Sequence, residues 1–270
     1  MEPLKSPTPL ISVITIVRNC AGTIEETIAS VLGQTWPRLE YIIVDGGSTD
    51  GTIEIVQRCA PRLAHWLSEP DRGISDALNK GARLSQGDLL LFMNAGDSFV
   101  DSTALERAVA AIDPAAIVRE TIFYGDALFA NGASSHRLEP NHERLREDSV
   151  LCHQSMLIGA DVQKYNPYDE RFAIAMDYDL WLRCLGRYPF VKLPVLISNY
   201  AAGGISSSDK YVVRSIIERA IARILNRQRA FNFPAIAELF RELVIITGKR
   251  SLKRLAGPDF YGKLKSVLGR

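Results

Sequence analysis

The sequence predicts an α/β fold: a mostly parallel sheet with helices on both faces, followed by a helical segment at the C-terminus. Two observations predict it. Short β-branched and aliphatic runs alternate with stretches of helical periodicity through the first half of the chain. Most residues in these runs are aliphatic or β-branched, which is typical of strands buried on both faces of a parallel sheet. A composition of 47% apolar and 23% charged residues is that of an ordinary globular protein.

In the first half, each expected strand is followed by an expected helix. We predict strands at 11–17, 40–44, 64–67 and 88–93, and helices at 24–33, 52–60, 74–84 and 104–112. Thr23 and Thr103 are each followed by a glutamate three residues later, which is the spacing of a helix-starting capping box. This alternation predicts a doubly wound, Rossmann-like arrangement.

The second half is less regular. We predict strands at 121–130, 156–158 and 190–197, a short helix at 177–185, and a polar loop at 131–148. Beyond residue 206 an apolar stripe with helical spacing is formed by Val213, Ile216, Ile217, Ala220, Ile221 and Ile224. We therefore expect a main domain at 1–206 and a basic, amphipathic helical segment at 207–270.

Charge is distributed unevenly along the chain. The net charge is only +1, yet the residues from 206 onward hold 14 Lys and Arg against five Asp and Glu. A basic segment on an acidic body favours contact with an anionic membrane surface. Packing of the stripe on the sheet domain, or a solvated helical face, is the alternative. No aromatic or fold motif supports nucleic-acid binding, so none is expected.

The four cysteines are widely spaced and form no CxxC pair, which fits reduced thiols in a cytoplasm. The N-terminus has no apolar run of the signal-peptide type, and no window approaches the roughly 18 apolar residues needed to cross a bilayer. We expect a cytoplasmic protein, peripheral at most on the inner face of the plasma membrane.

Polar clusters follow all four strands expected in the first half. They are Arg18-Asn19, the segment 45–48, the segment 69–73 and the segment 94–97. Because the carboxyl ends of parallel strands meet at one edge of the sheet, these clusters predict a ligand crevice there.

Several stretches resemble one family, in order along the chain. They are PLISVITIVRN, QTWPRLEYIIVDGGSTDGT, EPDRGISDALNKGA and GDLLLFMNAGD, followed by His153-Gln154 and by DYDLWLR at 177–183. Over roughly 9–206 the chain resembles family 2 glycosyltransferases, in particular those that build bacterial surface polysaccharides. The resemblance implies the GT-A fold, a nucleotide-diphosphate sugar donor, and inverting transfer to an acceptor hydroxyl, for example on a lipid-linked glycan.

The resemblance assigns a donor-binding role to several residues. It places Asp45 at the nucleoside, with an Asx-turn or cap residue as the alternative, and Gly46 stands where many relatives carry a second Asp. Arg72 suits the diphosphate, because a guanidinium can form two parallel hydrogen bonds with phosphate oxygens. Asp76 and Asn79 are one helical turn apart and are expected to share a face that lines the donor pocket, with a solvated helix position as the alternative for Asp76.

Two further segments are assigned to phosphate and metal. The loop with Gly203 and Gly204 precedes a helix and suits phosphate, with a plain connector as the alternative. Asn94 and Asp97 occupy the place of the family's Asp-x-Asp motif, which holds Mg²⁺ or Mn²⁺. Here only Asp97 is a carboxylate, a departure from the family pattern.

The acceptor side is assigned to the second half of the chain. His153 and Gln154 are expected there, with His153 as a metal or phosphate ligand or, alternatively, a structural core residue. Asp177 is the expected catalytic base, with Met176 in place of the family's Glu. Asp177 is also a candidate N-cap of the helix that follows it. Asp179, only two residues further on, is expected to point elsewhere.

Two other functions compete with this interpretation. The altered metal motif and the missing Glu also fit a non-catalytic nucleotide-sugar-binding or regulatory protein. A nucleotidyltransferase is expected to carry a Gly-rich loop with an arginine directly after the first strand. Residues 18–22 match that pattern only weakly.

Overall fold

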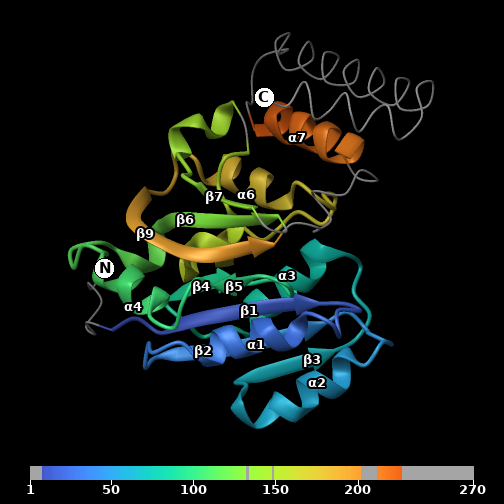
Figure 1. Cartoon of the computed structure of the whole chain (residues 1–270). Helices are drawn as coiled ribbons and strands as arrows, with labels where there is room; N and C mark the ends of the chain where they lie inside the picture. The colour runs from blue at the N-terminus through green and yellow to red at the C-terminus, as the bar shows by residue number, and fades with distance from the viewer. Residues whose placement is uncertain (1–7, 132–133, 148, 202–211, 227–270) are drawn as a thin grey trace.

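The computed structural model describes residues 8–131, 134–147, 149–201 and 212–226 (Figure 1). The strands are β1 (Ile11–Val17), β2 (Leu39–Asp45), β3 (His65–Ser68), β4 (Leu89–Phe92), β5 (Ser98–Phe99), β6 (Ile122–Asn131), β7 (Ser134–Leu138), β8 (Met156–Gly159) and β9 (Phe190–Ala201). The α-helices are α1 (Ile24–Leu32), α2 (Thr52–Cys59), α3 (Ile74–Leu84), α4 (Ala104–Ala110), α5 (Ala160–Tyr165), α6 (Met176–Cys184) and α7 (Val212–Asn226). Short 3₁₀ turns include η3 (His142–Arg146) and η4 (His153–Ser155).

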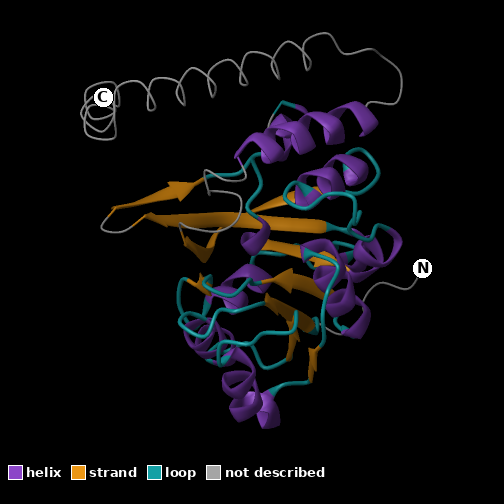
Figure 2. Cartoon of the chain, turned by 90° about the vertical axis from the view of Figure 1, so that its right-hand side faces the viewer, coloured by secondary structure: helices purple, strands orange, loops and turns teal. Residues whose placement is uncertain are grey.

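All the described strands join one mixed sheet in the order β3-β2-β1-β4-β8-β6-β9-β5, with β7 paired to β6. The first four are parallel to one another. The direction reverses between β4 and β8, which pair antiparallel. The predicted α/β fold is thus confirmed, with its parallel part in the first half of the chain. Figure 2 shows the helices packed around this sheet, from which the two long strands β6 and β9 project.

Each face of the sheet is covered by its own set of helices. Ile11 and Val13 of β1 join one core cluster with residues of α1, α2 and α4, while Ile14 faces the other cluster with residues of α3, α5 and α6. This division follows from the period-2 alternation of a strand. Gly81 lets α3 approach β1 closely, since a Cβ there would collide with Ile14.

The predicted strands and helices of the first half are confirmed to within about two residues. The capping boxes are wrong: neither Thr23 nor Thr103 caps its helix through its side chain. Thr103 instead bonds to Asp101, which precedes it and offers a closer acceptor. The predicted loop at 131–148 is also wrong, because β7 and η3 lie there.

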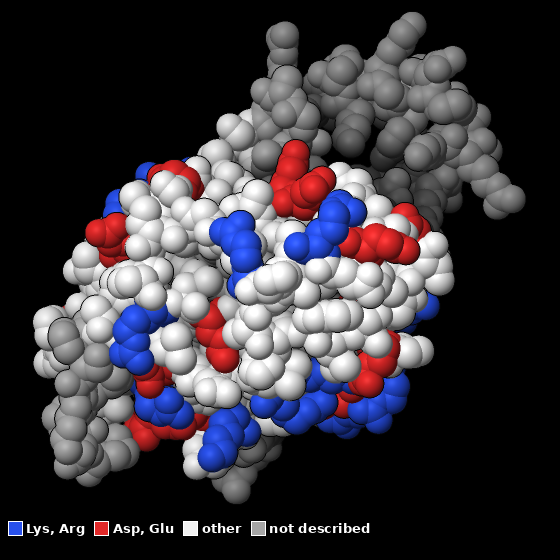
Figure 3. All heavy atoms as spheres, turned by 90° about the horizontal axis from the view of Figure 1, so that it is seen from below, with Lys and Arg blue, Asp and Glu red and all other residues white. Residues whose placement is uncertain are grey.

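Helix α7 packs beside α6, at the top of the molecule in Figure 1. The predicted apolar stripe divides between two surroundings: Ile216 and Ala220 are buried, whereas Ile217, Ile221 and Ile224 are 38–46% exposed. No described helix is both long and apolar enough to span a bilayer. On the face shown in Figure 3, basic and acidic side chains are interspersed.

Candidate functional site

Asp45, the last residue of β2, is fully buried by the turn that follows it. One carboxylate oxygen accepts hydrogen bonds from the N–H groups of Gly47 (3.1 Å) and Ser48 (3.0 Å) and from the hydroxyl of Ser68 (2.7 Å). Gly47 has φ +78°, which favours glycine. The carboxylate therefore fixes the shape of this turn, and Ser68 is a partner that sequence reasoning missed.

Gly46 packs against the side chain of Asp71. A Cβ built on Gly46 would collide with the Asp71 carboxylate. Asp71 is held by the N–H of Gly73, which donates to Oδ1 at 2.9 Å. A carboxylate therefore lies against Gly46 even though position 46 itself carries none.

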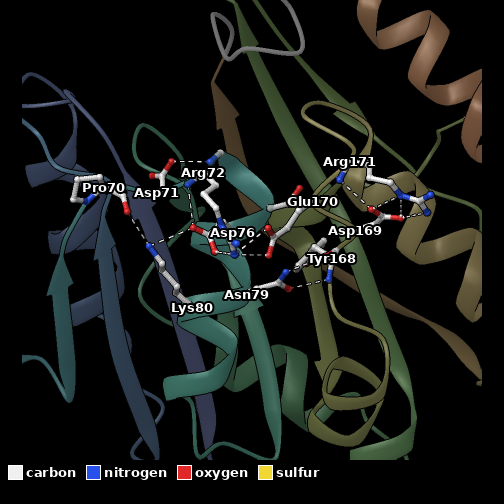
Figure 4. Close-up of polar contacts among 12 residues, drawn as sticks. Pro70, Asp71, Arg72, Asp76, Asn79, Lys80, Tyr168, Asp169, Glu170 and Arg171 are labelled. Atoms are coloured by element: carbon white, nitrogen blue, oxygen red, sulfur yellow. Dashed lines mark hydrogen bonds and ion pairs between the residues drawn. The ribbon is translucent and has the colours of Figure 1, made fainter.

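Arg72 and Asp76 belong to an ion-pair cluster at the start of α3 (Figure 4). The Arg72 guanidinium contacts Asp76 Oδ1 and Glu170, each at 3.0 Å, and Lys80 Nζ lies 3.3 Å from Asp76. The backbone N–H and then the guanidinium of Arg72 lower the pKa of Asp76 to about 2. Arg72 itself is exposed, so an anionic ligand can reach it from solvent.

The side chains of Ser75 and Asn79 in α3 form hydrogen bonds with the backbone of the loop 166–175. The Asn79 side chain donates to the carbonyl of Tyr168 and accepts from its N–H, each at 2.9 Å (Figure 4). The Ser75 hydroxyl donates to the carbonyl of Phe172 at 2.8 Å. Asp76 and Asn79 share the buried face, as predicted, but both polar ends of Asn79 are used by the protein backbone.

Asp97 and Asn94 come together in a turn after β4, closed by the Asp97 N–H on the Asn94 carbonyl at 3.0 Å. Gln154 donates its amide to Asp97 Oδ2 at 2.8 Å. Asn94 Oδ1 is buried and has no hydrogen-bond partner. Among the described residues no group of three or more His, Cys, Asp or Glu gathers in metal-binding geometry. The turn thus presents two side-chain oxygens.

His153, in η4, lies in the aromatic core behind this turn. Its ring is 5.0 Å from that of Phe92 and 6.1 Å from that of Trp181, and its Nε2 is hydrogen-bonded to the Tyr168 hydroxyl at 2.8 Å. Burial lowers the pKa of His153 to about 4, so the imidazole is neutral at pH 7. The packing favours the structural alternative for His153 and leaves Gln154 as the residue that faces Asp97.

Asp177 is the second residue of α6 and is half-buried. Burial raises its pKa to about 6, although hydrogen bonds from the N–H groups of Tyr178 and of Asp177 itself, and the charge of Arg219, each lower it. The predicted N-cap role is wrong: the helix begins at Met176, one residue before Asp177, and its N-cap position is occupied by Ala175. Asp179 points elsewhere as expected, onto Arg183 at 2.8 Å.

The carboxylates of Asp97 and Asp177 both act on Cys152, in the segment that precedes β8. Burial raises the pKa of Cys152 to about 12, and the charges of both carboxylates contribute in the same direction. Both therefore lie close enough to this thiol to act on it electrostatically. One carboxylate comes from the parallel half of the sheet and the other from a helix of the second half. Gly203 and Gly204 lie outside the described residues.

The chain belongs to glycosyl transferase family 2, whose model matches residues 12–161. An uncharacterised glycosyltransferase of Mycobacterium tuberculosis is 32% identical over 74% of this chain and 78% of its own length. A PGL/p-HBAD biosynthesis glycosyltransferase of Mycobacterium bovis is 30% identical over 74% and 80%. The chain is therefore a glycosyltransferase.

Solved structures show the same fold at lower identity. TarS of Staphylococcus aureus, residues 1–349 in complex with UDP-GlcNAc, superposes with a TM-score of 0.65 at 18% identity, over 92% of this chain and 76% of that one. A mannosyltransferase of Pyrobaculum calidifontis in complex with GDP-Man and Mn²⁺ superposes with a TM-score of 0.62 at 16% identity, over 98% and 81%.

Proposed function

We propose that the chain transfers a sugar, with inversion at the anomeric carbon, from a nucleotide-diphosphate sugar to an acceptor hydroxyl. The observation that carries the proposal is the environment of Asp177. Inverting transfer needs one carboxylate that takes the proton of the attacking hydroxyl. With a pKa of about 6, Asp177 is mostly ionised at pH 7 yet more basic than an ordinary aspartate.

The donor belongs at the carboxyl ends of β1, β2 and β4. We place the nucleoside at the turn that Asp45 fixes, where the Asp71 carboxylate beside Gly46 can accept hydrogen bonds, and the exposed Arg72 suits the diphosphate. The complexes of TarS with UDP-GlcNAc and of the Pyrobaculum enzyme with GDP-Man support a donor of this class. We assign to Asp76 the role of holding the Arg72 guanidinium in place, and to Gly203 and Gly204 the role of binding the phosphates.

A divalent ion, Mg²⁺ or Mn²⁺, fits the turn that contains Asn94 and Asp97. The buried Asn94 Oδ1 has no protein partner, and Asp97 adds a carboxylate. Magnesium is commonly held by one or two protein oxygens together with substrate phosphates. When bound, the ion would neutralise charge on the leaving diphosphate. Gln154 holds Asp97 in place, and the Mn²⁺ in the Pyrobaculum complex supports the assignment.

The acceptor proposed is a lipid-linked glycan of the cell envelope. The mycobacterial PGL/p-HBAD relative supports envelope glycoconjugate synthesis. The exposed isoleucines of α7 and the basic character of the segment after 206 suit a helix that lies on an anionic leaflet. The enzyme would then act at the cytoplasmic face of the membrane that carries its acceptor.

Thermal unfolding with UDP, GDP, dTDP and CMP, each with and without Mn²⁺, tests the donor site. A ligand at about 100 times its Kd stabilises the fold by about 2.7 kcal/mol, which shifts Tm measurably. We expect one nucleotide to raise Tm, and to do so only with metal. A shift that is equal in EDTA would remove the ion from the proposal. No shift with any nucleotide would overturn the donor site.

A non-catalytic nucleotide-sugar-binding function is the second candidate, favoured by Asn94 in the metal motif and Met176 before Asp177. The two functions separate in a donor-consumption assay with acceptor-containing membranes, run on the wild type and on Asp177→Asn. The proposed enzyme consumes donor, and the variant consumes none while its nucleotide-induced Tm shift remains. Donor binding without consumption by the wild type would favour the alternative.

A further inference from the structure

Three consecutive N–H groups just before α6 converge on one carboxylate. The N–H groups of Ala173, Ile174 and Ala175 donate to Glu218 Oε2 at 3.0, 2.8 and 3.0 Å, and Ala173 also reaches Oε1 at 3.2 Å. Glu218 lies on α7, 43 residues beyond Ala175, and is only 6% exposed. The start of α6 is therefore capped by a residue distant in the sequence.

A carboxylate in this position is favourable on two grounds. Three consecutive N–H groups just before the helix point at one carboxylate, and the N-terminal end of the helix dipole attracts negative charge. The N-cap residue Ala175 makes no side-chain cap bond, and within the first turn Asp177 Oδ1 accepts from the N–H of Tyr178 at 2.7 Å. Burial raises the pKa of Glu218, but the hydrogen bonds from Ala175, Arg214, Ile174 and Ala173 together hold it below its usual value, so the group is charged at pH 7.

The capped segment leads directly into the proposed base. Asp177 follows Ala175 by two residues, so the direction of its side chain depends on where the first turn of α6 begins. Glu218 is itself held, since Arg214 Nε donates to its Oε1 at 2.6 Å. A second contact joins the helices further along, where Asn226 donates to Asp179 at 2.9 Å.

We propose that Glu218 is a positioning residue for Asp177. Helix α7, which carries Glu218, is then part of the catalytic unit. The inference rests on the proposed role of Asp177 as the base. Glu218 acts through the backbone of 173–175 and does not itself contact the reacting atoms. Without this cap the first turn of α6 frays, and Asp177 loses both its direction and its shielding from water.

Glu218→Gln and Glu218→Ala test the proposal, with Asn226→Ala as the matched control. The control removes the hydrogen bond from Asn226 on α7 to Asp179 on α6 and leaves the contacts of residues 173–175 unchanged. The glutamine keeps acceptor oxygen without the charge, whereas the alanine keeps neither. We expect kcat to fall about tenfold in the glutamine variant and further in the alanine variant, with donor KM within twofold of wild type. Asn226→Ala should keep wild-type kcat.

The pH profile separates positioning from mere loss of stability. The groups that act on Asp177 electrostatically or share its surroundings are Arg219 of α7, Tyr168 of the preceding loop and Cys152. Greater exposure of Asp177 should move the acidic midpoint of kcat/KM in Glu218→Gln from about 6 toward the ordinary aspartate value. The assay temperature is set below the Tm of every variant.

Two outcomes would overturn this inference: an unchanged kcat and midpoint in Glu218→Gln, or an equal loss of kcat in Glu218→Gln and Asn226→Ala. Asp177→Asn is assayed in parallel. If Asp177→Asn retains turnover, the proposed base is wrong. If Asp177→Asn is inactive while Glu218→Gln behaves as wild type, only the positioning role fails. If Glu218→Ala fails to fold, the kcat and the pH midpoint of Glu218→Gln still test the positioning role.

Discussion

At the scale of single residues, two aspartates of the proposed site lie in different environments. Asp97 accepts a hydrogen bond from Gln154 in the turn that also holds the unpartnered Oδ1 of Asn94. Asp177 is half-buried, and burial raises its pKa to about 6. Two carboxylates in unlike surroundings are a common basis for a division of roles in catalysis.

The raised pKa of Asp177 predicts that the wild type is less stable than Asp177→Asn at neutral pH. In the unfolded chain the group ionises near 3.8, in the folded chain near 6. The folded state thus binds the proton more tightly, and stability falls as pH rises between these values. A pKa difference of about two units changes the free energy of unfolding by no more than about 3 kcal/mol. Urea unfolding should show the variant more stable at pH 7.5, by a margin that shrinks at pH 4.5.

The same group sets the expected pH dependence of catalysis. Transfer should rise with pH through about 6 and level off above it, because only the ionised carboxylate takes the proton of the acceptor. Initial rates of donor consumption across pH 5–8 measure the profile. A rate that is flat down to pH 5 contradicts Asp177 as the base.

Some residues of the site could be predicted from the sequence and others could not, for a physical reason. Asp45, Asp97 and Asp177 stand beside recognisable strand or helix patterns, so their neighbourhood was predictable. Tyr168 and Glu218 act through contacts with segments 15 to 89 residues away. Local patterns carry no information about such pairings. The only hint was that Glu218 is the single acid within 212–226.

At the scale of elements, α3 does two tasks at once. Its N-terminal end carries the ion pairs of Arg72 and Asp76, and its buried face binds the loop 166–175 through Ser75 and Asn79. The proposed donor contacts at Arg72 are thereby connected to the loop that leads to Asp177, the proposed base. The bounds of α3 followed from its apolar periodicity, but its partner loop did not, because short irregular segments have no periodic signal.

Asn79→Ala is expected to lower the free energy of unfolding by about 1–3 kcal/mol, because it leaves the buried N–H and carbonyl of Tyr168 without partners. Urea unfolding measures the loss. Gln57→Ala, at an exposed position on α2, is the control and should change stability by less than about 0.5 kcal/mol. Equal values for the two variants would contradict the role of Asn79.

At the scale of the whole molecule, α7 has one buried edge and one exposed edge. Ile216, Ala220 and Glu218 are buried, and Glu218 hydrogen-bonds the residues that precede α6, while Ile217, Ile221 and Ile224 are exposed. The sequence predicted the stripe but left open whether it packs on the domain or meets a membrane. Helical spacing alone cannot divide a wide stripe between two such environments. The division of the chain at residue 206 stays a prediction.

Replacing Ile217, Ile221 and Ile224 by aspartate should abolish co-sedimentation with vesicles that contain anionic lipid. The change removes apolar area from the interface and adds negative charge against a negative leaflet. Ile117→Asp is the control, because Ile117 is 53% exposed and lies elsewhere, before β6. If the triple variant sediments as the wild type does, the open face of α7 is not the membrane contact.

The reversal of strand direction between β4 and β8 has a consequence for how substitutions act on the site. Only two residue pairs join the strands at this seam, and the proposed donor contacts lie largely on one side of it and the proposed base on the other. Side chains nevertheless tie the two sides together, since Ser75 and Asn79 hydrogen-bond the loop 166–175 and Gln154 hydrogen-bonds Asp97. A substitution at any of these positions therefore acts on both sides at once.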